Sequence, residues 1–365
     1  EDMKKFLALA LLLIAIPAPA QAVEAIHLTE SSHRQIDGKF LDDSLAVLIS
    51  PDGSLGRLVF NPPIGYRIWN IDAALIDDVS IMANGYKLVS GANGIGQNVA
   101  KNWLARLKTT AARDQINAVA YGNPSGYWIH RLDPHNESYY LSVSADRLTK
   151  FFGRQIISPS AYSNTNYFHL TTSQSQSFSD MRDAIQATAK YMDPLALENL
   201  QLKGVALFNP NLDADMRNSL AKDLGSNTFD ILHKIRLAPG RFTISTRKQE
   251  LPITVINDFP NPAALQLSVM AMNGRIKTID HLDVKLDGKS RVQVKIPVEV
   301  LTSGSSTLAI GIVNEKKVQM GDFVLYPLTL RTISPIATWL TTIAALTLFI
   351  SAVAQSVRRI RKRER

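Results

Sequence analysis

The sequence predicts an α/β domain, then an all-β immunoglobulin- or fibronectin-like sandwich, and then one C-terminal transmembrane helix. Three patterns support this order. Short apolar runs alternate with helical patterns between residues 61 and 235, apolar and polar residues alternate within residues 236–330, and residues 333–354 contain no charged side chain. The first pattern is typical of a parallel sheet with helices, the second of sheets with one buried face, and the third of a membrane span.

Composition excludes several classes of function. The chain has 365 residues and no cysteine, so disulfides, thiolate metal sites and cysteine nucleophiles are excluded. Its formal net charge is +8, and the tail at residues 355–365 supplies most of it through six basic residues and one glutamate. The other positive charge is dispersed and forms no basic block that could follow a phosphate backbone. We therefore predict no nucleic-acid partner.

Residues 1–22 have the pattern of a secretory signal peptide. Two lysines precede an apolar run from Phe6 to Ile16, and Ala20-Gln21-Ala22 then supplies the small residues that a signal peptidase reads. We predict cleavage after Ala22, with Ala20 as the other site, and a natural start at Met3. The alternative interpretation is an uncleaved anchor, for which the apolar run is short.

Residues 23–60 contain the short apolar runs Leu45–Ile49 and Leu58–Phe60 around a Pro-Asp-Gly turn, and they predict a short β-rich lead-in. From residue 61 strands alternate with helices, which predicts a mainly parallel sheet. The repeats are too few for an eight-fold barrel, so the domain at 61–235 is predicted to be a partial or degraded βα-barrel-like layer. The predicted strands are 67–71, 116–120, 167–170 and 205–208, and the predicted helices are 73–82, 97–112, 144–152, 178–192 and 213–224.

Carboxylates near the ends of the predicted strands are the candidate catalytic groups, because chemistry in α/β folds collects there. Asp72 ends the first strand of the domain, and Asp78 follows in the next helix. Glycoside hydrolysis needs two carboxylates that flank one bond, so the candidate pair is Asp72 with Asp78 or with Asp133. The competing interpretation of Asp72 is the N-cap of the following helix, a position that aspartate favours.

Aromatic and amide side chains near the same strand ends are the candidate binding residues. Tyr121 and Asn123 follow the strand at 116–120. Trp69 and Trp128 are candidates for stacking on sugar rings, although tryptophan is more commonly a core residue.

No metal site and no cofactor are predicted. His130 and His135 flank an aspartate, but they are five residues apart with a proline between them, and metal ligands on one helix face need a spacing of four. The glycine-rich segment 91–96 follows no strand and fits neither nucleotide-binding fingerprint.

Residues 236–330 predict the second domain. Seven short alternations of apolar and polar residues are separated by turn sequences such as Asn273-Gly274 and Asp287-Gly288. They predict seven strands in a sandwich without the Cys–Trp–Cys signature of antibody domains, an architecture common in spacers and binding modules. The predicted inward positions are Phe242, Ile244, Leu251, Ile253, Val255, Leu265, Leu267, Val269, Leu282, Val284, Leu286, Val292, Val294, Ile296, Val298, Val300, Leu308, Ile310, Ile312, Phe323 and Leu325.

Residues 333–354 predict the membrane span. At a rise of about 1.5 Å per helical residue, this run reaches the roughly 30 Å of a bilayer core. The basic residues that follow predict a cytoplasmic tail at 355–365, near anionic headgroups, and an ectodomain outside the cell membrane. The competing interpretation is a buried helix of a soluble domain.

Three segments carry a resemblance to a known family: Trp69-Asn70-Ile71-Asp72-Ala73-Ala74-Leu75, Gly240-Arg241-Phe242-Thr243-Ile244-Ser245 and Leu251-Pro252-Ile253-Thr254-Val255-Ile256-Asn257-Asp258. They resemble an uncharacterised actinobacterial family of secreted, membrane-anchored proteins, a domain of unknown function encoded beside the lipid II flippase gene. The resemblance covers residues 60 to 365 and implies a link to peptidoglycan export without implying a reaction.

The chain departs from that family in two ways. Family members usually carry an additional β-rich domain before the α/β part, where this chain has only residues 23–60. The family also tends to carry aspartates where this chain has Tyr121-Gly122-Asn123-Pro124-Ser125. Asparagine and serine cannot act as a carboxylate acid or base, so an activity located there in relatives would be lost here.

These observations predict a membrane-anchored extracytoplasmic protein of the cell envelope, and they favour a binding protein over an enzyme. Its expected partner is an envelope-assembly protein such as the lipid II flippase, or a cell-wall glycan. The alternative is a carbohydrate-active hydrolase or deacetylase, which needs a second carboxylate within about 10 Å of Asp72 in a cleft.

Overall fold

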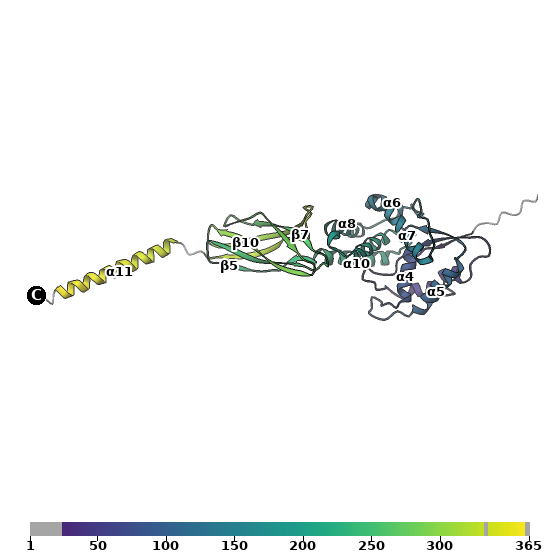
Figure 1. Ribbon diagram of the computed structural model, residues 1–365, viewed down its shortest axis with the longest axis horizontal. Helices are drawn as coiled ribbons and strands as arrows, with labels where there is room; N and C mark the ends of the chain where they lie inside the picture. Colours follow the sequence, from purple (N-terminus) through teal and green to yellow (C-terminus); the bar gives the residue numbers. More distant parts are fainter. Residues whose placement is uncertain (1–23, 332–334, 362–365) are drawn as a thin grey trace, which may run out of the picture. The chain divides into compact units, whose positions relative to one another are not determined.

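The computed structural model describes residues 24–331 and 335–361, which form two compact units (Figure 1). One unit comprises the residues up to Arg182 together with Leu195–Asn227, and the other comprises Asp183–Pro194 together with the residues from Thr228 onward. The predicted signal peptide at residues 1–22 lies outside the described residues. The predicted mixture of helices and sheets is confirmed.

The first unit is built on a parallel sheet in the order β1-β2-β3, formed by Glu24–Leu28, Arg67–Asp72 and Gln115–Val119. Helices connect the strands, as parallel pairing requires. The helices from residue 44 to residue 232 are α2 (Ser44–Ile49), α3 (Ser54–Phe60), α4 (Ala73–Ala83), α5 (Gln97–Thr110), α6 (Gly126–Leu132), α7 (Glu137–Phe152), α8 (Thr172–Thr188), α9 (Pro194–Ala206) and α10 (Ala214–Leu232), with short 3₁₀ turns at Pro134–Asn136 and Ala189–Tyr191.

Helices α4 and α5 have the buried residues that their sequence patterns predict. In α5 the buried residues Ala100, Trp103 and Leu107 recur at the helical period, and α4 buries Leu75, Val79 and Met82 in the same way. The predictions at 73–82 and 97–112 are therefore confirmed, and the strands at 67–71 and 116–120 are confirmed as β2 and β3.

The β-rich lead-in is only partly correct. Strand β1 adds to the sheet, but Leu45–Ile49 and Leu58–Phe60 lie in α2 and α3 rather than in strands. In α3 the buried positions are Leu55, Gly56 and Val59, which is a helical spacing. The turn between the helices is so tight that a Cβ on Gly56 would lie 1.6 Å from the Ser50 carbonyl oxygen, so only glycine fits there.

Three further predictions need correction. Residues 167–170 form an irregular segment, and residues 205–208 form the end of α9 and the turn that follows it, because a short buried apolar run does not distinguish a strand from a helix. Helix α7 begins at Glu137, so the predicted helix 144–152 is only its C-terminal part, and Ser144 lies buried inside it.

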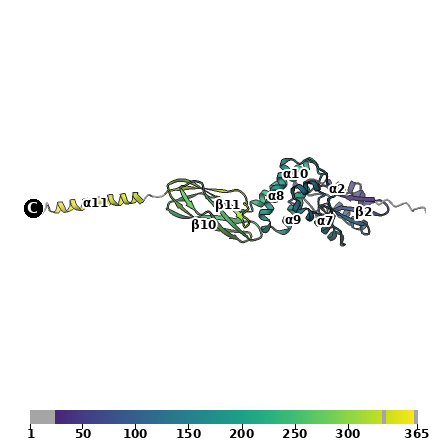
Figure 2. The ribbon, with the colours of Figure 1, turned by 90° about the horizontal axis from the view of Figure 1, so that it is seen from above.

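The second unit contains two sheets whose inner faces are buried (Figure 2). The pairing is antiparallel except between β5 and β12, and the all-β character predicted for residues 236–330 is confirmed. One sheet has the order β4-β6-β10-β8, formed by Ile235–Leu237, Lys248–Asn257, Ser290–Val300 and Ile276–Thr278. The other has the order β5-β12-β11-β7-β9, formed by Phe242–Ile244, Val324–Leu330, Gly304–Asn314, Ala263–Ala271 and His281–Leu286.

The period-two pattern located the long strands correctly, with one exception. Leu251, Ile253 and Val255 of β6 are buried and alternate with outward residues, as predicted. In β12 the inward residues are Tyr326, Leu328 and Leu330, whereas the predicted Phe323 and Leu325 are exposed. Phe323 and Leu325 are odd-numbered, whereas the inward residues are even-numbered. Successive side chains of a strand point to opposite faces, so an assignment that is one residue out places every side chain on the wrong face.

Strand β8 covers only part of the edge of β10. It pairs with Val298–Val300, while residues 290–297 of β10 have a strand partner only on the β6 side among the described residues.

The C-terminal segment forms helix α11, Pro335–Arg361 (Figure 1). Its described side chains, Trp339 and residues 341–355, are all exposed. Within the part of the chain that the structure describes, no helix is sufficiently long and apolar to traverse a bilayer. The predicted span at 333–354 falls partly on residues outside this part, so the helix is confirmed and the membrane crossing is not.

Candidate functional site

The strand-end loop, residues 120–125, lies beside the start of α4 because β2 and β3 are adjacent parallel strands, with Asp72 opposite Val119. The carboxylate Oδ1 of Asp72 accepts a hydrogen bond of 2.8 Å from the Ala74 N–H and another of 2.9 Å from the Gly122 N–H. Asp72 is thus the N-cap of α4, as the competing interpretation predicted, and it also ties the strand-end loop to the helix. Gly122 has a φ of +77°, which favours glycine.

Asp72 is a buried carboxyl group that titrates near neutrality. Its side chain is fully buried, and Oδ2 has no hydrogen-bond partner among the described residues. Burial raises the pKa of Asp72 to about 7, against the opposing effect of the two backbone N–H groups. Repulsion from Asp78 and Asp77 contributes in the same direction as burial, so these three carboxyl groups lie within electrostatic range of one another.

Asp77 joins the strand end to α7 and α9. Tyr121, two residues after β3, donates its hydroxyl hydrogen to Asp77 Oδ2 at 2.8 Å, and Arg147 of α7 forms an ion pair with the same carboxylate. Arg147 also contacts Glu198 at 3.1 Å and lies over the Tyr121 ring. Burial raises the pKa of Tyr121 well above its ordinary value, so this hydroxyl serves as a hydrogen-bond donor.

Asp78 lies in a separate buried cluster with two cations. Its Oδ1 is 2.8 Å from Arg34 Nε and 3.3 Å from Lys203 Nζ, and Ser32 donates to its Oδ2 at 3.3 Å. Burial alone would raise the pKa of Asp78, but Lys203 and Arg34 overcome it and hold the pKa below its ordinary value. Burial lowers the pKa of Lys203 to about 8. The cluster joins three distant parts of the chain.

Asp133 belongs to a third set of contacts, between α6 and α7. It accepts hydrogen bonds from Tyr140 at 2.5 Å and Asn136 at 2.8 Å, and it is 3.0 Å from Arg182. The structure therefore brings Asp72 near Asp78, places Asp133 in a separate group of contacts, and engages both Asp78 and Asp133 with side chains of the same chain.

The candidate binding residues divide into core and surface positions. Trp69 is fully buried and donates its indole N–H to Asp114 at 2.8 Å, so it is a core residue. Asn123 has a φ of +44° and accepts a hydrogen bond of 3.0 Å from Ser163. Trp128 is mostly buried, but it lies against exposed tyrosines of the surface.

Sequence reasoning missed the residues that complete these networks. Arg34, Arg147 and Lys203 pair with carboxylates 44, 70 and 125 residues away, respectively. No local pattern marks such pairs; the available signal was limited to Lys203, a charged residue among the apolar residues of a helix. In the part of the chain that is described, no group of three or more His, Asp or Glu side chains could hold a metal ion.

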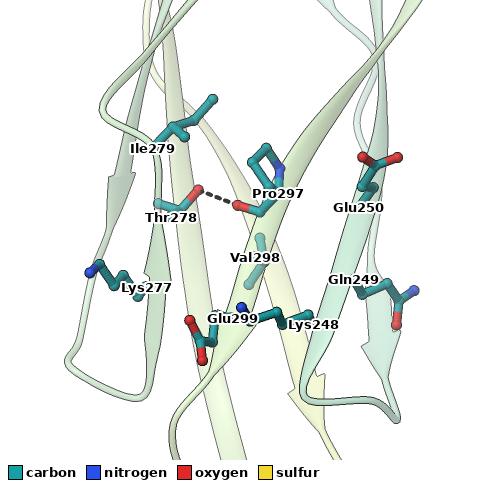
Figure 3. Close-up of a pocket in the computed structure, with 9 residues that line it drawn as sticks. All are labelled: Lys248, Gln249, Glu250, Lys277, Thr278, Ile279, Pro297, Val298 and Glu299. Carbon is teal, nitrogen blue, oxygen red and sulfur yellow. Dashed lines mark hydrogen bonds between the residues drawn. The ribbon is translucent and has the colours of Figure 1, made fainter.

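The second unit has a shallow groove of about 480 Å³ on the outer face of the β6, β10 and β8 strands (Figure 3). Glu299 of β10 lies between Lys248 of β6 and Lys277 of β8 in the cross-strand register, and the Thr278 hydroxyl donates to the Pro297 carbonyl at 2.9 Å. Opposite charges in neighbouring strands stabilise a sheet surface, so the charged residues that line the groove have a structural role.

The substitution Asp72→Asn tests whether the pKa of the Asp72 carboxyl group is raised in the folded protein. Because the folded pKa of Asp72 lies above its unfolded value, the native state binds the proton more tightly. The contribution of the carboxyl group is fully present below the unfolded pKa and is lost as pH rises through about 7. Asp72→Asn keeps an Oδ1 acceptor but removes the ionisation. We expect urea unfolding at pH 5 and pH 8 to show the variant gaining, relative to wild type, on the order of 1 kcal/mol or more at pH 8.

The matched control for this prediction is Asp52→Asn, at an exposed turn position. Its stability relative to wild type should not change between the two pH values. An equal pH dependence in both variants would contradict the assignment to Asp72.

Comparison with known proteins places the chain in a family. The chain matches a family of unknown function (DUF6049) over residues 104–363. No curated protein matches. Similar solved structures include the alpha-2-macroglobulin of E. coli in its native conformation (20% identity, TM-score 0.22, 27% of this chain and 6% of that chain) and a PapD-like domain of human CEP192 (10%, 0.22, 27% and 85%). The CARDB domain of the PF1109 protein from Pyrococcus furiosus is a third (13%, 0.22, 27% and 96%).

At these TM-scores the solved structures carry no argument about function, and the chain spans only a small part of the macroglobulin. The family match, by contrast, extends over well more than half of the sequence. The chain therefore belongs to the family of unknown function DUF6049.

Proposed function

We propose that this chain is a non-catalytic, extracytoplasmic binding protein of the cell envelope, held at the membrane by α11. The observation that carries the proposal is the state of the candidate carboxylates. Asp77, Asp78 and Asp133 are engaged by arginine, lysine or tyrosine side chains, and Asp72 is fully buried while it holds two backbone N–H groups. Carboxylates bound in this way brace the fold and are not available to flank a substrate bond.

The exposed surface of α11 supports attachment to an apolar environment. Ile343, Leu346 and Ile350 are more than half exposed, and Leu348 and Phe349 are exposed on other sides of the helix. A helix that is apolar around its circumference is unfavourable in water. With the basic residues after it in the cytosol, the two units would lie outside.

The partner we propose is an envelope-assembly protein such as the lipid II flippase, or a cell-wall glycan. The resemblance described above, with its neighbourhood to peptidoglycan export, motivates this choice. The sheets of residues 235–330 would act as an immunoglobulin- or fibronectin-like spacer or binding module.

The experiment uses the full chain in membranes. A cytoplasm-specific reporter fused after Arg365 should be active, and the tagged protein should sediment with membranes and, after detergent extraction, recover an envelope-assembly protein or glycan. A reporter active only outside the cell, a protein found in the soluble fraction, or a pull-down that recovers neither partner class would overturn the proposal.

The second candidate function is a carbohydrate-active hydrolase or deacetylase. It is favoured by one observation, the pKa of Asp72 near 7 with an unpartnered Oδ2, because perturbed carboxyl groups cluster at active sites. Purified peptidoglycan incubated with the full chain should release neither reducing ends nor acetate. Release by the wild type that disappears in Asp72→Asn would establish the enzyme instead.

A further inference from the structure

Four aromatic rings gather on the first unit where α6 meets the irregular segment between α7 and α8. Tyr127 and Trp128 of α6 have ring centroids 5.2 Å apart, and Tyr167 lies 5.3 Å from Tyr127 and 5.7 Å from Trp128. Phe168 lies 6.1 Å from Trp128. Trp128 is buried and Phe168 is half-buried, whereas Tyr127 is 41% and Tyr167 60% exposed.

The two exposed rings stand nearly at right angles. The interplanar angle between Tyr127 and Tyr167 is 84°, and that between Tyr127 and Trp128 is 89°. Edge-to-face packing of this kind leaves part of each tyrosine available to a ligand. The surface therefore presents two aromatic walls that meet at a corner.

Hydrogen bonds join the two segments that carry these rings. The indole N–H of Trp128 donates to the Phe168 carbonyl at 3.0 Å, the Gly126 N–H donates to the Asn164 carbonyl at 2.8 Å, and the Ser125 hydroxyl donates to the Asn166 carbonyl at 2.6 Å. Beneath them, the guanidinium of Arg217 lies 4.4 Å from the centre of the Phe168 ring. A surface ordered in advance loses little conformational entropy when it binds.

The segment that carries Tyr167 has no acidic or basic side chain other than histidine. From Gln155 to Ser179 there is no aspartate, glutamate, lysine or arginine, in a protein of which 20% of residues are charged. The exposed side chains that precede Tyr167 include the hydroxyls and amide of Ser163, Thr165 and Asn166, whereas Arg131 is exposed one turn beyond Tyr127 on α6. On the Tyr167 side the rim therefore has hydrogen-bonding groups suited to a neutral, hydroxyl-rich ligand.

Core packing accounts for Trp128 and for part of Phe168. Trp128 is buried and Phe168 is half-buried, and both pack between α6 and the segment that crosses it. Tyr127 and Tyr167 add little to that core, because much of each ring faces solvent. Exposed tyrosines flanked by serine and asparagine are typical of binding surfaces.

We propose that Tyr127 and Tyr167 form a saccharide-binding corner that takes a neutral glycan, with the hydroxyls and amides of residues 163–166 around it. One face of a pyranose ring consists of C–H groups, which suit the electron-rich face of a tyrosine, and its hydroxyls suit the rim on the Tyr167 side. The inference rests on the proposed function, because it assigns the glycan arm of that function to a place on the first unit.

The test is calorimetric titration of the detergent-solubilised full chain with a tetramer of N-acetylglucosamine. Tyr127→Ala and Tyr167→Ala should each weaken binding by about tenfold, the effect of truncating an aromatic anchor at an interface. The control is Tyr66→Ala, which removes another exposed tyrosine of the same unit, one that donates to Gln115, and it should leave the affinity unchanged. Circular dichroism confirms that each variant is folded.

The possible results distinguish the saccharide-binding corner from the proposed non-catalytic function. The absence of tetramer binding by the wild type, or equal affinities for the wild type and both platform variants, would overturn the saccharide-binding corner. If such a result accompanied recovery of an envelope-assembly protein from membranes, the proposed function would stand without the corner. A chain that cleaved the tetramer would instead overturn the non-catalytic assignment. A titration with an uncharged proline-rich peptide that reproduced the tyrosine dependence, with no response to the tetramer, would reassign the surface to peptides.

Discussion

Asp78→Ala should lower the free energy of unfolding of the first unit by about 3–5 kcal/mol, the range for removing one partner from a buried ion pair. Arg34 and Lys203 would then lie side by side in the interior without the carboxylate that both contact. Urea unfolding followed by tryptophan fluorescence measures this unit well, because Trp69, Trp103 and Trp128 all lie in it.

Two variants make this prediction specific. Asp37→Ala removes an exposed ion pair with Lys39 and should change stability by less than about 1 kcal/mol. The double variant Asp78→Ala, Lys203→Met removes one stranded charge and should recover part of the loss, since partners in one network are not additive. The loss should also be smaller above pH 8, where Lys203 can shed its proton. An Asp78→Ala loss no larger than that of Asp37→Ala would refute the assignment.

Trp69→Ala should also destabilise the first unit by about 3–5 kcal/mol, because it empties the space of a fully buried indole in the central strand. Arg67 also contacts the carboxylate of Asp114, the partner of the indole N–H, so Asp114 stays paired in the variant. Most of the loss should therefore reflect packing. Trp69→Phe restores most of the ring volume and should cost clearly less.

The same substitution separates two interpretations of Trp69. As a core residue it sets stability, and the Trp69→Phe protein should bind an oligosaccharide as the wild type does. If Trp69→Ala left the unfolding midpoint unchanged but abolished saccharide binding, Trp69 would be a stacking surface and its buried position would be wrong.

The sequence predicted the second unit better than the first, for a physical reason. Strands with one solvent-exposed face, such as β6, alternate between apolar and polar residues, so the sequence shows which residues point inward. The run Leu45–Ile49 is apolar on its exposed side as well, because Val47 faces solvent while Leu45 and Ile49 are buried. Hydrophobicity alone therefore shows no helical period there, and the run does not distinguish a helix from a strand. In β12 the pattern was present, but the apolar residues Phe323 and Leu325 point outward, and nothing local could reveal that.

The candidate site divides in the same way. The N-cap role of Asp72 was readable because it depends only on a strand that ends directly before a helix. The environment of Asp78 was not readable, because Lys203 lies 125 residues away and is brought there by the fold. Tyr127 and Tyr167 were missed because their exposure depends on how an irregular segment crosses α6.

The short reach of β8 has a consequence for solubility. The uncovered stretch of β10 offers backbone groups that a strand from another molecule could pair with, the usual starting point of intermolecular sheet growth. Its exposed side chains include Arg291 and Lys295, and Pro297 closes the stretch with no N–H to donate. Lys295 also lies 3.2 Å from Glu250. Charged side chains and a proline on an open edge disfavour pairing with a further strand, so this border is protected against sheet growth between molecules.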